Sequence, residues 1–199
     1  MIRPFDPLHR LGPCAPAGEG GSSDDPMTLA GSGHMRIDRD GTWYHEGRPI
    51  ERKDLVRLFS TVLRREDDGG YCLKTPVERV PVEVEDAPFL AVELRREDSG
   101  RNQVLLFRTN VEQWVEAGAD HPIRVTQAPE TGEPRPYILV RDGLEALIAR
   151  SVFYELVDLA QPNETDGTDD KTGNRQGEVV GVWSRGSFFP LGPSTATAD

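Results

Sequence analysis

Residues 71–90 read YCLKTPVERVPVEVEDAPFL, and residues 105–124 read LLFRTNVEQWVEAGADHPIR. The second stretch follows the first at an offset of 34 residues, and the two align without a gap. Thr75 falls on Thr109 and Lys74 on Arg108, and each copy has an apolar strand, a polar break, a second apolar patch and an Asp-x-Pro turn. This pattern predicts a duplicated strand-turn-strand motif whose copies pack as halves of a shared core. The alternative is a chance similarity between two strand-turn-strand segments.

A helix is predicted before the repeat, within residues 51–67. Its apolar residues follow the i, i+3, i+4, i+7 spacing of one helical face at Leu55, Leu58, Phe59 and Val62. The acidic and glycine-rich stretch 67–70 is expected to end it. Further upstream, Asp40-Gly41 is a hairpin turn signal between two short strands.

A second helix is predicted after the repeat, beginning at Asp142. Glu145 stands three residues later, which is the spacing of a capping box. The apolar stripe of this predicted helix consists of Leu144, Leu147, Ile148, Val152, Leu156 and Leu159. The last apolar segment, EVVGVWSRGSFFPLG (178–192), predicts a hairpin that turns at Arg185-Gly186 and packs back on the core.

The predicted fold class is therefore α+β, with mainly antiparallel strands, two amphipathic helices and the internal duplication. Residues 1–34 and 193–199 are expected to be disordered, because they are polar, rich in Gly, Pro and Ser, and lack hydrophobic periodicity. Residues 35–160 are expected to form the α+β core with both repeats. Residues 161–176 are read as a flexible linker and 177–192 as the C-terminal hairpin.

The composition narrows the classes of function. The formal net charge of −11 argues against a nucleic-acid-binding protein, because binding to the phosphate backbone requires clustered Lys and Arg. No stretch approaches the ~20 apolar residues of a membrane span, and the start lacks a secretory signal, so we expect a cytoplasmic protein. The two cysteines, Cys14 and Cys72, have neither metal nor redox spacing, and no cofactor is predicted. Oligomeric state stays open.

Several motifs of the ordered part resemble a bacterial family of uncharacterised proteins, domain of unknown function 1285. They are DGTWYHEGRPI, LVRLFSTVLRRED, YCLKTPVERV, VEVEDAPF, FRTN, HPIRV, PYILVRDGLEALIARSVFYELV and GVWS with FFPLG. The resemblance covers residues 35–192 in one order. It implies an α+β fold of repeated strand-helix motifs and a role in ligand binding or signal transduction. The family supplies no established catalytic residues.

One set of residues could form a binding site. Lys74-Thr75 and Arg108-Thr109-Asn110 stand at equivalent places of the two copies, each at a strand end, and Arg65 follows the first helix. Cations and hydroxyls from both copies could bind a carboxylate or phosphate through charge-assisted hydrogen bonds. The alternative is that the threonines cap turns and the cations protect strand edges from aggregation.

Three functions remain. The first is a non-catalytic module that binds a small anion or has a regulatory role. The second is a protein-interaction module that recognises its partner by strand addition, and the third is a hydrolase of unknown substrate. Catalysis has the weakest support, because no nucleophile stands beside a base in any known motif, and Cys72 is interpreted as a buried apolar residue.

Overall fold

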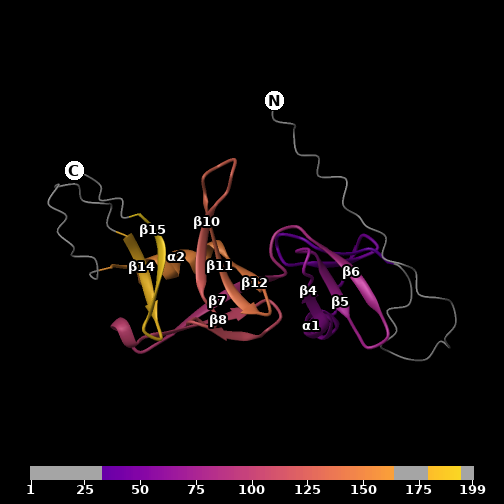
Figure 1. Cartoon of the computed structure of the whole chain (residues 1–199), viewed down its shortest axis with the longest axis horizontal. Helices are drawn as coiled ribbons and strands as arrows, with labels where there is room; N and C mark the ends of the chain where they lie inside the picture. The colour runs from indigo at the N-terminus through magenta and orange to yellow at the C-terminus, as the bar shows by residue number, and fades with distance from the viewer. Residues whose placement is uncertain (1–32, 164–178, 194–199) are drawn as a thin grey trace. The chain divides into compact units, whose positions relative to one another are not determined.

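The computed structural model describes residues 33–163 and 179–193, and within these ranges its strands form three sheets (Figure 1). The segments predicted to be a disordered start, a linker and a disordered tail lie outside the described residues except at their borders. Most strand pairs are antiparallel and two α-helices accompany them in the described part, so the α+β prediction is confirmed. No helix there is long and apolar enough to cross a membrane.

The N-terminal sheet has the order β3-β2-β1-β6-β5-β4, with β1 and β6 parallel. Its strands are β1 (Met35–Ile37), β2 (Trp43–His45), β3 (Arg48–Pro49), β4 (Leu63–Arg65), β5 (Tyr71–Lys74) and β6 (Arg79–Val84). Helix α1 (Lys53–Val62) joins β3 to β4 and contacts β5. The apolar core of this N-terminal part includes Trp43, Ile37 and Leu73, all of them fully buried.

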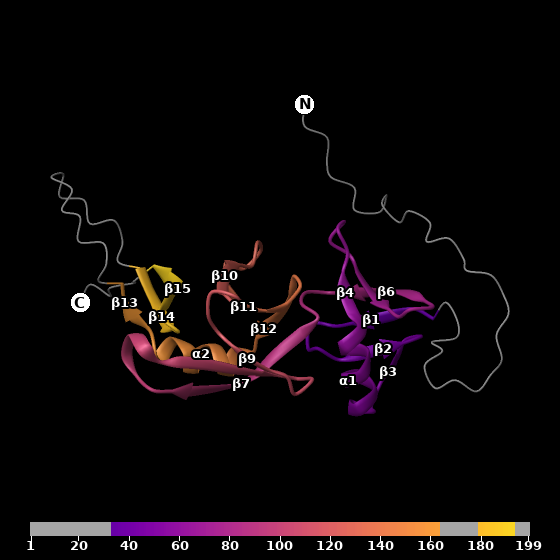
Figure 2. The same cartoon turned by 60° about the horizontal axis from the view of Figure 1, so that its bottom comes forward.

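The C-terminal sheet has the order β10-β11-β12-β7-β8-β9, with β12 and β7 parallel. Its strands are β7 (Phe89–Glu97), β8 (Val104–Thr109), β9 (Trp114–Glu116), β10 (Ile123–Gln127), β11 (Pro134–Arg141) and β12 (Leu144–Ile148). A 3-10 turn, η1 (Gly100–Asn102), lies between β7 and β8. Helix α2 (Arg150–Asp158) runs along β7 (Figure 2), and its Leu156 is fully buried.

The third sheet contains β13 (Gln161–Pro162), β14 (Val179–Ser184) and β15 (Ser187–Pro193), and β15 packs against β10 (Figure 1). The buried Ser184 hydroxyl attaches this sheet to its neighbour. It donates to the Ala117 carbonyl at 2.7 Å and accepts from the Leu105 amide at 3.0 Å. The β14–β15 turn at Arg185-Gly186 has positive φ at both residues, as a tight hairpin of type I′ requires.

The duplicated motif forms two equivalent hairpins, β5–β6 and β8–β9. Leu73 is paired with Val80 in the first hairpin, and Phe107 with Val115 in the second. The first hairpin belongs to the N-terminal sheet and the second to the C-terminal sheet. Each copy therefore packs mainly with the strands that surround it in the chain.

Helix α1 is shorter than the stretch 51–67 in which the sequence predicts it. It ends at Val62, and Leu63 turns to an extended conformation with φ −66° and ψ 134°. Leu63 then pairs with Leu73 in the sheet and is completely buried there. Leu58, which the spacing places on the buried face, is 42% exposed. Sheet pairing overrides the helical pattern at this end.

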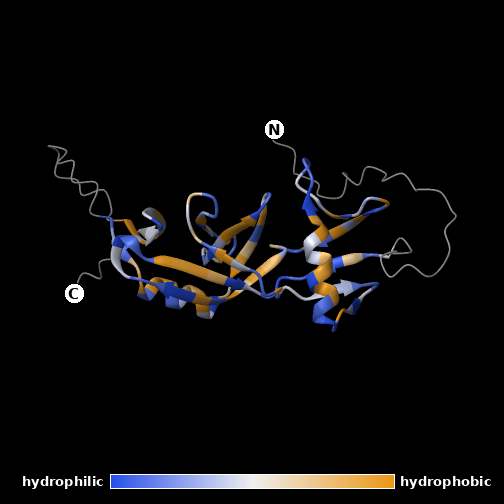
Figure 3. Cartoon of the chain, turned by 90° about the horizontal axis from the view of Figure 1, so that it is seen from below, coloured by the Kyte–Doolittle hydropathy of each residue, from blue (hydrophilic) through white to orange (hydrophobic). Residues whose placement is uncertain are grey.

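The prediction of a helix beginning at Asp142 was wrong. Asp142 and Gly143 have φ of 43° and 74°, which makes them a tight turn between β11 and β12 rather than a helix cap. Leu144 and Ile148 are buried in β12, which alternates between buried and half-exposed positions along its length. The helix starts only at Arg150. Figure 3 shows hydrophobic and hydrophilic positions alternating along α2, as expected for a helix with one face on a sheet.

Candidate functional site

Thr75 and Thr109 each close the turn of their own hairpin. The Thr75 amide donates to the Glu78 carbonyl at 2.9 Å, and the Thr75 hydroxyl accepts from the Glu78 amide at 3.0 Å. In the second copy the Thr109 amide and hydroxyl make the same two bonds with Gln113, at 2.9 and 3.1 Å. The second turn is therefore one residue longer than the first.

The two arginines of the predicted site each have a hydrogen-bond partner within the protein. The Arg108 Nε donates to a Glu93 carboxylate oxygen at 2.6 Å. Arg65 donates to the Gly143 carbonyl at 3.1 Å and lies over the Tyr71 ring.

Asn110, in the β8–β9 turn, bonds to strand β7 and to the β1–β2 turn. Its side-chain oxygen accepts from the Leu90 amide at 3.2 Å, and its Nδ2 donates to the Gly41 carbonyl at 3.0 Å.

The two predicted pairs are not brought together. Lys74 is exposed on β5 of the N-terminal sheet, whereas Arg108 and Thr109 lie on β8 of the C-terminal sheet. Within residues 33–163 and 179–193, no hydrogen bond or ion pair joins the two groups. Their role in binding stays a prediction.

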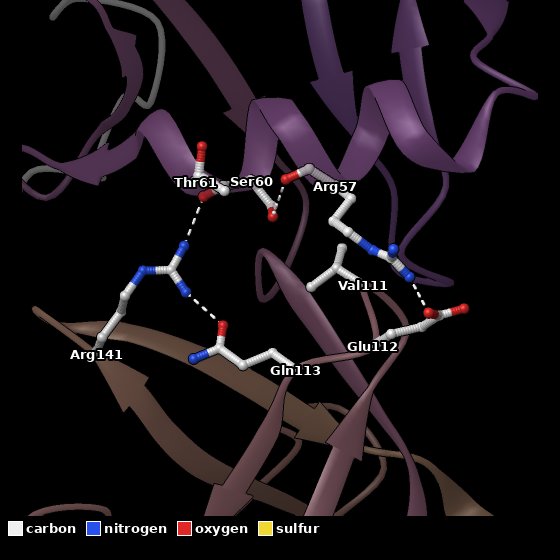
Figure 4. A pocket seen from close by; sticks show the side chains of 7 residues that line it. All are labelled: Arg57, Ser60, Thr61, Val111, Glu112, Gln113 and Arg141. Atoms are coloured by element: carbon white, nitrogen blue, oxygen red, sulfur yellow. Dashed lines mark hydrogen bonds and ion pairs between the residues drawn. The ribbon is translucent and has the colours of Figure 1, made fainter.

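The longer turn of the second copy borders a cavity of about 560 Å³ (Figure 4). The cavity is lined by residues of α1, of the β8–β9 turn and of the end of β11, which are Arg57, Ser60, Thr61, Val111, Glu112, Gln113 and Arg141. Thr109 and Asn110 directly precede this lining, so two of the predicted residues lie beside it in the chain.

Arg141 is a half-buried cation with uncharged hydrogen-bond partners. Its Nη1 donates to the Gln113 Oε1 at 2.6 Å, and its Nη2 donates to the Ser60 carbonyl at 2.5 Å. Its guanidinium also lies 5.2 Å from the centre of the Phe89 ring. In the part of the chain that the structure describes, no carboxylate is within ion-pair distance of it.

Burial is the main cause that lowers the pKa of Arg141, and the nearby charge of Arg64 lowers it further, while Asp142 acts in the opposite direction. Arginine nevertheless stays protonated in proteins at any ordinary pH. A guanidinium has five N–H donors, and two here point to neutral oxygens. An anion that reached the cavity would therefore find a preorganised donor group that makes no ion pair with any described residue.

The second cation of the cavity, Arg57, is already paired. It makes an ion pair with Glu112 from the β8–β9 turn, and both side chains are about half exposed (Figure 4). Ser60 and Thr61 direct their hydroxyls to carbonyls of their own helix, those of Arg57 and Leu58, each at 2.7 Å. Among the described residues, neither hydroxyl bonds to a basic side chain.

A second cavity, of about 780 Å³, lies between the β10–β11 loop and the start of α2. Its basic residues are partly satisfied, since Arg135 donates to Asp86 at 2.8 Å and Arg150 to the Tyr154 hydroxyl at 2.8 Å. Acidic residues such as Glu133 line it as well. This mixture of charges gives no preference for an anion or a cation.

Cys72 and the acidic clusters offer no catalytic centre in the described residues. Burial raises the pKa of the Cys72 thiol, as does Glu66, whose carboxylate accepts its S–H at 2.6 Å. A thiol held protonated is a poor nucleophile. No group of three or more His, Cys, Asp or Glu side chains is placed to hold a metal ion within the described ranges.

Comparison with known proteins places the chain beside one family. Residues 25–87 match the family model "Domain of unknown function (DUF1285), N-terminal domain", and residues 88–191 match "Protein of unknown function (DUF1285), C-terminal domain". No curated protein matches.

Two solved structures of that family are similar. A DUF1285 family protein from Silicibacter pomeroyi DSS-3 is 49% identical, with a TM-score of 0.71 over 80% of each chain. Another, from Shewanella baltica OS155, is 27% identical, with a TM-score of 0.49, and covers 63% of this chain and 91% of its own.

The sequence did not indicate the central residues of this cavity. Arg57, Gln113 and Arg141 come from segments far apart in the chain, and no local motif links them. One signal was present: Arg141 ends the apolar strand PYILVR directly before an Asp-Gly turn. A cation at the end of a buried strand needs a hydrogen-bond partner, which marks Arg141 as a candidate site residue. Interpreting Asp142-Gly143 as the start of a helix hid this signal, because it places Arg141 outside a strand end.

Proposed function

Because the chain belongs to the DUF1285 family, which is named for its unknown function, we propose a function from the cavity itself: a non-catalytic module that binds a small carboxylate or phosphate. Arg141 is the primary contact. A role in signal transduction, which the family resemblance implies, belongs to the same proposal, with anion binding as its input. The cytoplasmic location that the sequence predicts is part of it as well.

The observation that carries this proposal is the half-buried charge of Arg141 with neutral partners. Its two bonds fix the plane of the guanidinium and leave further N–H groups for a ligand. Bonds between an arginine and a carboxylate or phosphate are charge-assisted and about twice as strong as neutral ones. Burial strengthens them, because it reduces competition from water.

A hydrolase is less well supported by the same cavity. Its two hydroxyls, those of Ser60 and Thr61, donate to carbonyls of their own helix. The carboxylate of Glu112, which lines the cavity, is paired with Arg57. Nucleophilic catalysis needs a hydroxyl or thiol beside a free base, and the described residues that line the cavity include no histidine.

Strand addition is also less well supported. The outermost strands of the two larger sheets are short: β3 has two residues, and β4 and β9 have three each. The longer outer strand β10 is packed against β15. Short or covered edges are how proteins avoid pairing with other chains.

The six residues predicted from the sequence take different places in this proposal. Thr109 and Asn110 shape the turn that lines the cavity, and Arg65 steadies the β11–β12 turn just beyond Arg141. Ligand contact by Lys74, Thr75 and Arg108 remains a separate proposal.

The test is a thermal-shift and calorimetric titration with inorganic phosphate and with glutarate. We expect the wild-type chain to be stabilised by about 2–3 kcal/mol at a concentration near 100 times Kd. Arg141→Gln should abolish this shift, and Arg141→Lys should keep a weaker one because the charge remains without the planar fork.

Arg124→Gln is the matched control, since Arg124 is an exposed arginine paired with Glu145 outside the cavity. It should leave the shift unchanged. An equal shift in wild type and Arg141→Gln, or no shift with either probe, would overturn the proposal.

A further inference from the structure

Glu112 occupies a backbone position that favours glycine. Its φ is 62°, and it is the last loop residue of the longer, second hairpin turn. The Glu112 amide donates to the Thr109 carbonyl at 2.8 Å, and the Thr109 amide donates to the Gln113 carbonyl. This is the three-residue hairpin turn whose last loop residue is left-handed and is usually Gly. A glutamate is less favourable than glycine at this position, so the conformation of the turn does not explain why a glutamate is there.

The corresponding residue of the first copy is Glu78, which closes a turn without the extra residue. Glu78 does not have a positive φ. The two glutamates are thus equivalent in sequence and different in conformation. Only the second one is carried to the cavity, where its carboxylate reaches Arg57 of α1 (Figure 4).

The arrangement of the cavity suggests what this carboxylate replaces. Arg57 and Arg141 lie on opposite sides of the lining, and Val111 lies between them with its apolar side chain (Figure 4). Glu112 neutralises one cation and leaves the other. A ligand that satisfied both would need two acidic groups separated by a short apolar spacer.

We infer that the Glu112 carboxylate is a built-in substitute for the second acidic group of the ligand, and that the ligand is a short diacid. One acid group binds Arg141, the spacer covers Val111, and the other acid group takes the place of Glu112 on Arg57. This inference rests on the proposed function. It adds that the ligand is a diacid, and that the Glu112 carboxylate competes with this ligand for Arg57 and so lowers its affinity.

Displacement of Glu112 is physically easy. The pair with Arg57 is about half exposed on both sides, and such ion pairs contribute little to stability because water and salt screen them. The carboxylate can therefore swing into solvent when a ligand arrives. While it is in place, it repels a second negative charge and keeps weak diacids out.

The experiment compares glutarate with valerate, a monoacid of the same chain length, in the full chain. Glu112→Gln frees Arg57, so the affinity for glutarate should rise by about fivefold, while that for valerate rises by less than about twofold. Glu78→Gln removes the same charge from the equivalent turn and should change neither affinity. Adding Arg57→Gln to Glu112→Gln should cancel the gain for glutarate.

The outcomes separate the two proposals. If both acids bind the wild type through Arg141 but Glu112→Gln raises their affinities equally, the inference fails and the anion-binding function stands. If neither glutarate, valerate nor phosphate binds the wild type or Glu112→Gln, both fail. A gain that survives Arg57→Gln also overturns the role assigned to Glu112.

Discussion

Tyr137 donates its phenolic hydroxyl to Asp86 at 2.8 Å, and the side chain of Asp86 is only 8% exposed. Arg135 donates to the other carboxylate oxygen at 2.8 Å. Asp86 lies in the loop between β6 and β7, close to the boundary between the two family matches. The bond therefore attaches the connection between the two sheets to strand β11.

This contact predicts a loss of stability in alkali. Burial, followed by the bond to Asp86, raises the pKa of Tyr137 to about 12, against 10.0 in the unfolded chain. A raised pKa in the folded state means that the stabilisation is complete below pH 10 and is lost as the pH rises toward 12. The loss should reach about 1–2 kcal/mol in urea unfolding measured between pH 9 and 12.

Tyr137→Phe is the control for that measurement. It cannot ionise, so its free energy of unfolding should fall less steeply over the same pH range. At pH 8 it should be less stable than the wild type by about 1–2 kcal/mol, because Asp86 loses a hydrogen bond. Parallel pH profiles of the two proteins would contradict the assignment.

Gly181 is predicted to tolerate no side chain. A Cβ at this position would overlap the main-chain oxygen of Phe189 on the paired strand β15. Backbone atoms cannot move aside as a flexible side chain can, so Gly181→Ala should destabilise the protein by about 2 kcal/mol or more in urea unfolding. Gly192→Ala, in the same hairpin with nothing near its Cβ, should change stability by less than about 0.5 kcal/mol. Equal effects of both substitutions would refute the steric argument.

Asn110 is predicted to contribute to stability through its two side-chain bonds to Leu90 and Gly41. Asn110→Ala leaves a half-buried amide and carbonyl without these partners, which should cost about 1–3 kcal/mol in urea unfolding. Asn102→Ala, at an exposed position in η1, is the control and should stay within about 0.5 kcal/mol. A wild-type stability for Asn110→Ala would show that the bonds are not formed in solution.

The sequence was informative where one periodicity was unambiguous. The offset of the two copies predicted the hairpins β5–β6 and β8–β9, because their strands and polar breaks recur in the same order. Residues 144–148 were ambiguous. Their apolar positions fit a helical stripe, yet Leu144 and Ile148 also fit strand alternation, and short apolar runs cannot be separated by period alone. The Asp142-Gly143 turn was the deciding signal.

The candidate site was less predictable, because it depends on contacts between distant segments. The repeat correctly placed Thr75 and Thr109 at equivalent turns, where both bond to their own hairpins. It could not reveal that the second turn is one residue longer and faces α1. Nor could it pair Arg141 with Ser60, since only the folded chain brings β11 to the helix.

Substitution with glycine should cost less stability at Glu112 than at Glu78, its equivalent in the first copy. At Glu112 the φ of 62° suits glycine, so Glu112→Gly relieves a conformation that costs an L-residue about 1 kcal/mol or more. It also removes a half-exposed ion pair with Arg57, which contributes between about 0 and 1 kcal/mol. Glycine also adds freedom to the unfolded chain, which costs about 0.5–1 kcal/mol here as it does at Glu78. The net effect on the free energy of unfolding should therefore lie within about 1 kcal/mol of zero. At Glu78, where φ is not positive, glycine only adds freedom to the unfolded chain, so Glu78→Gly should destabilise by about 0.5–1 kcal/mol. Urea unfolding of both variants at pH 7 decides the matter: if Glu112→Gly is the less stable of the two, the left-handed turn is not what distinguishes the second copy.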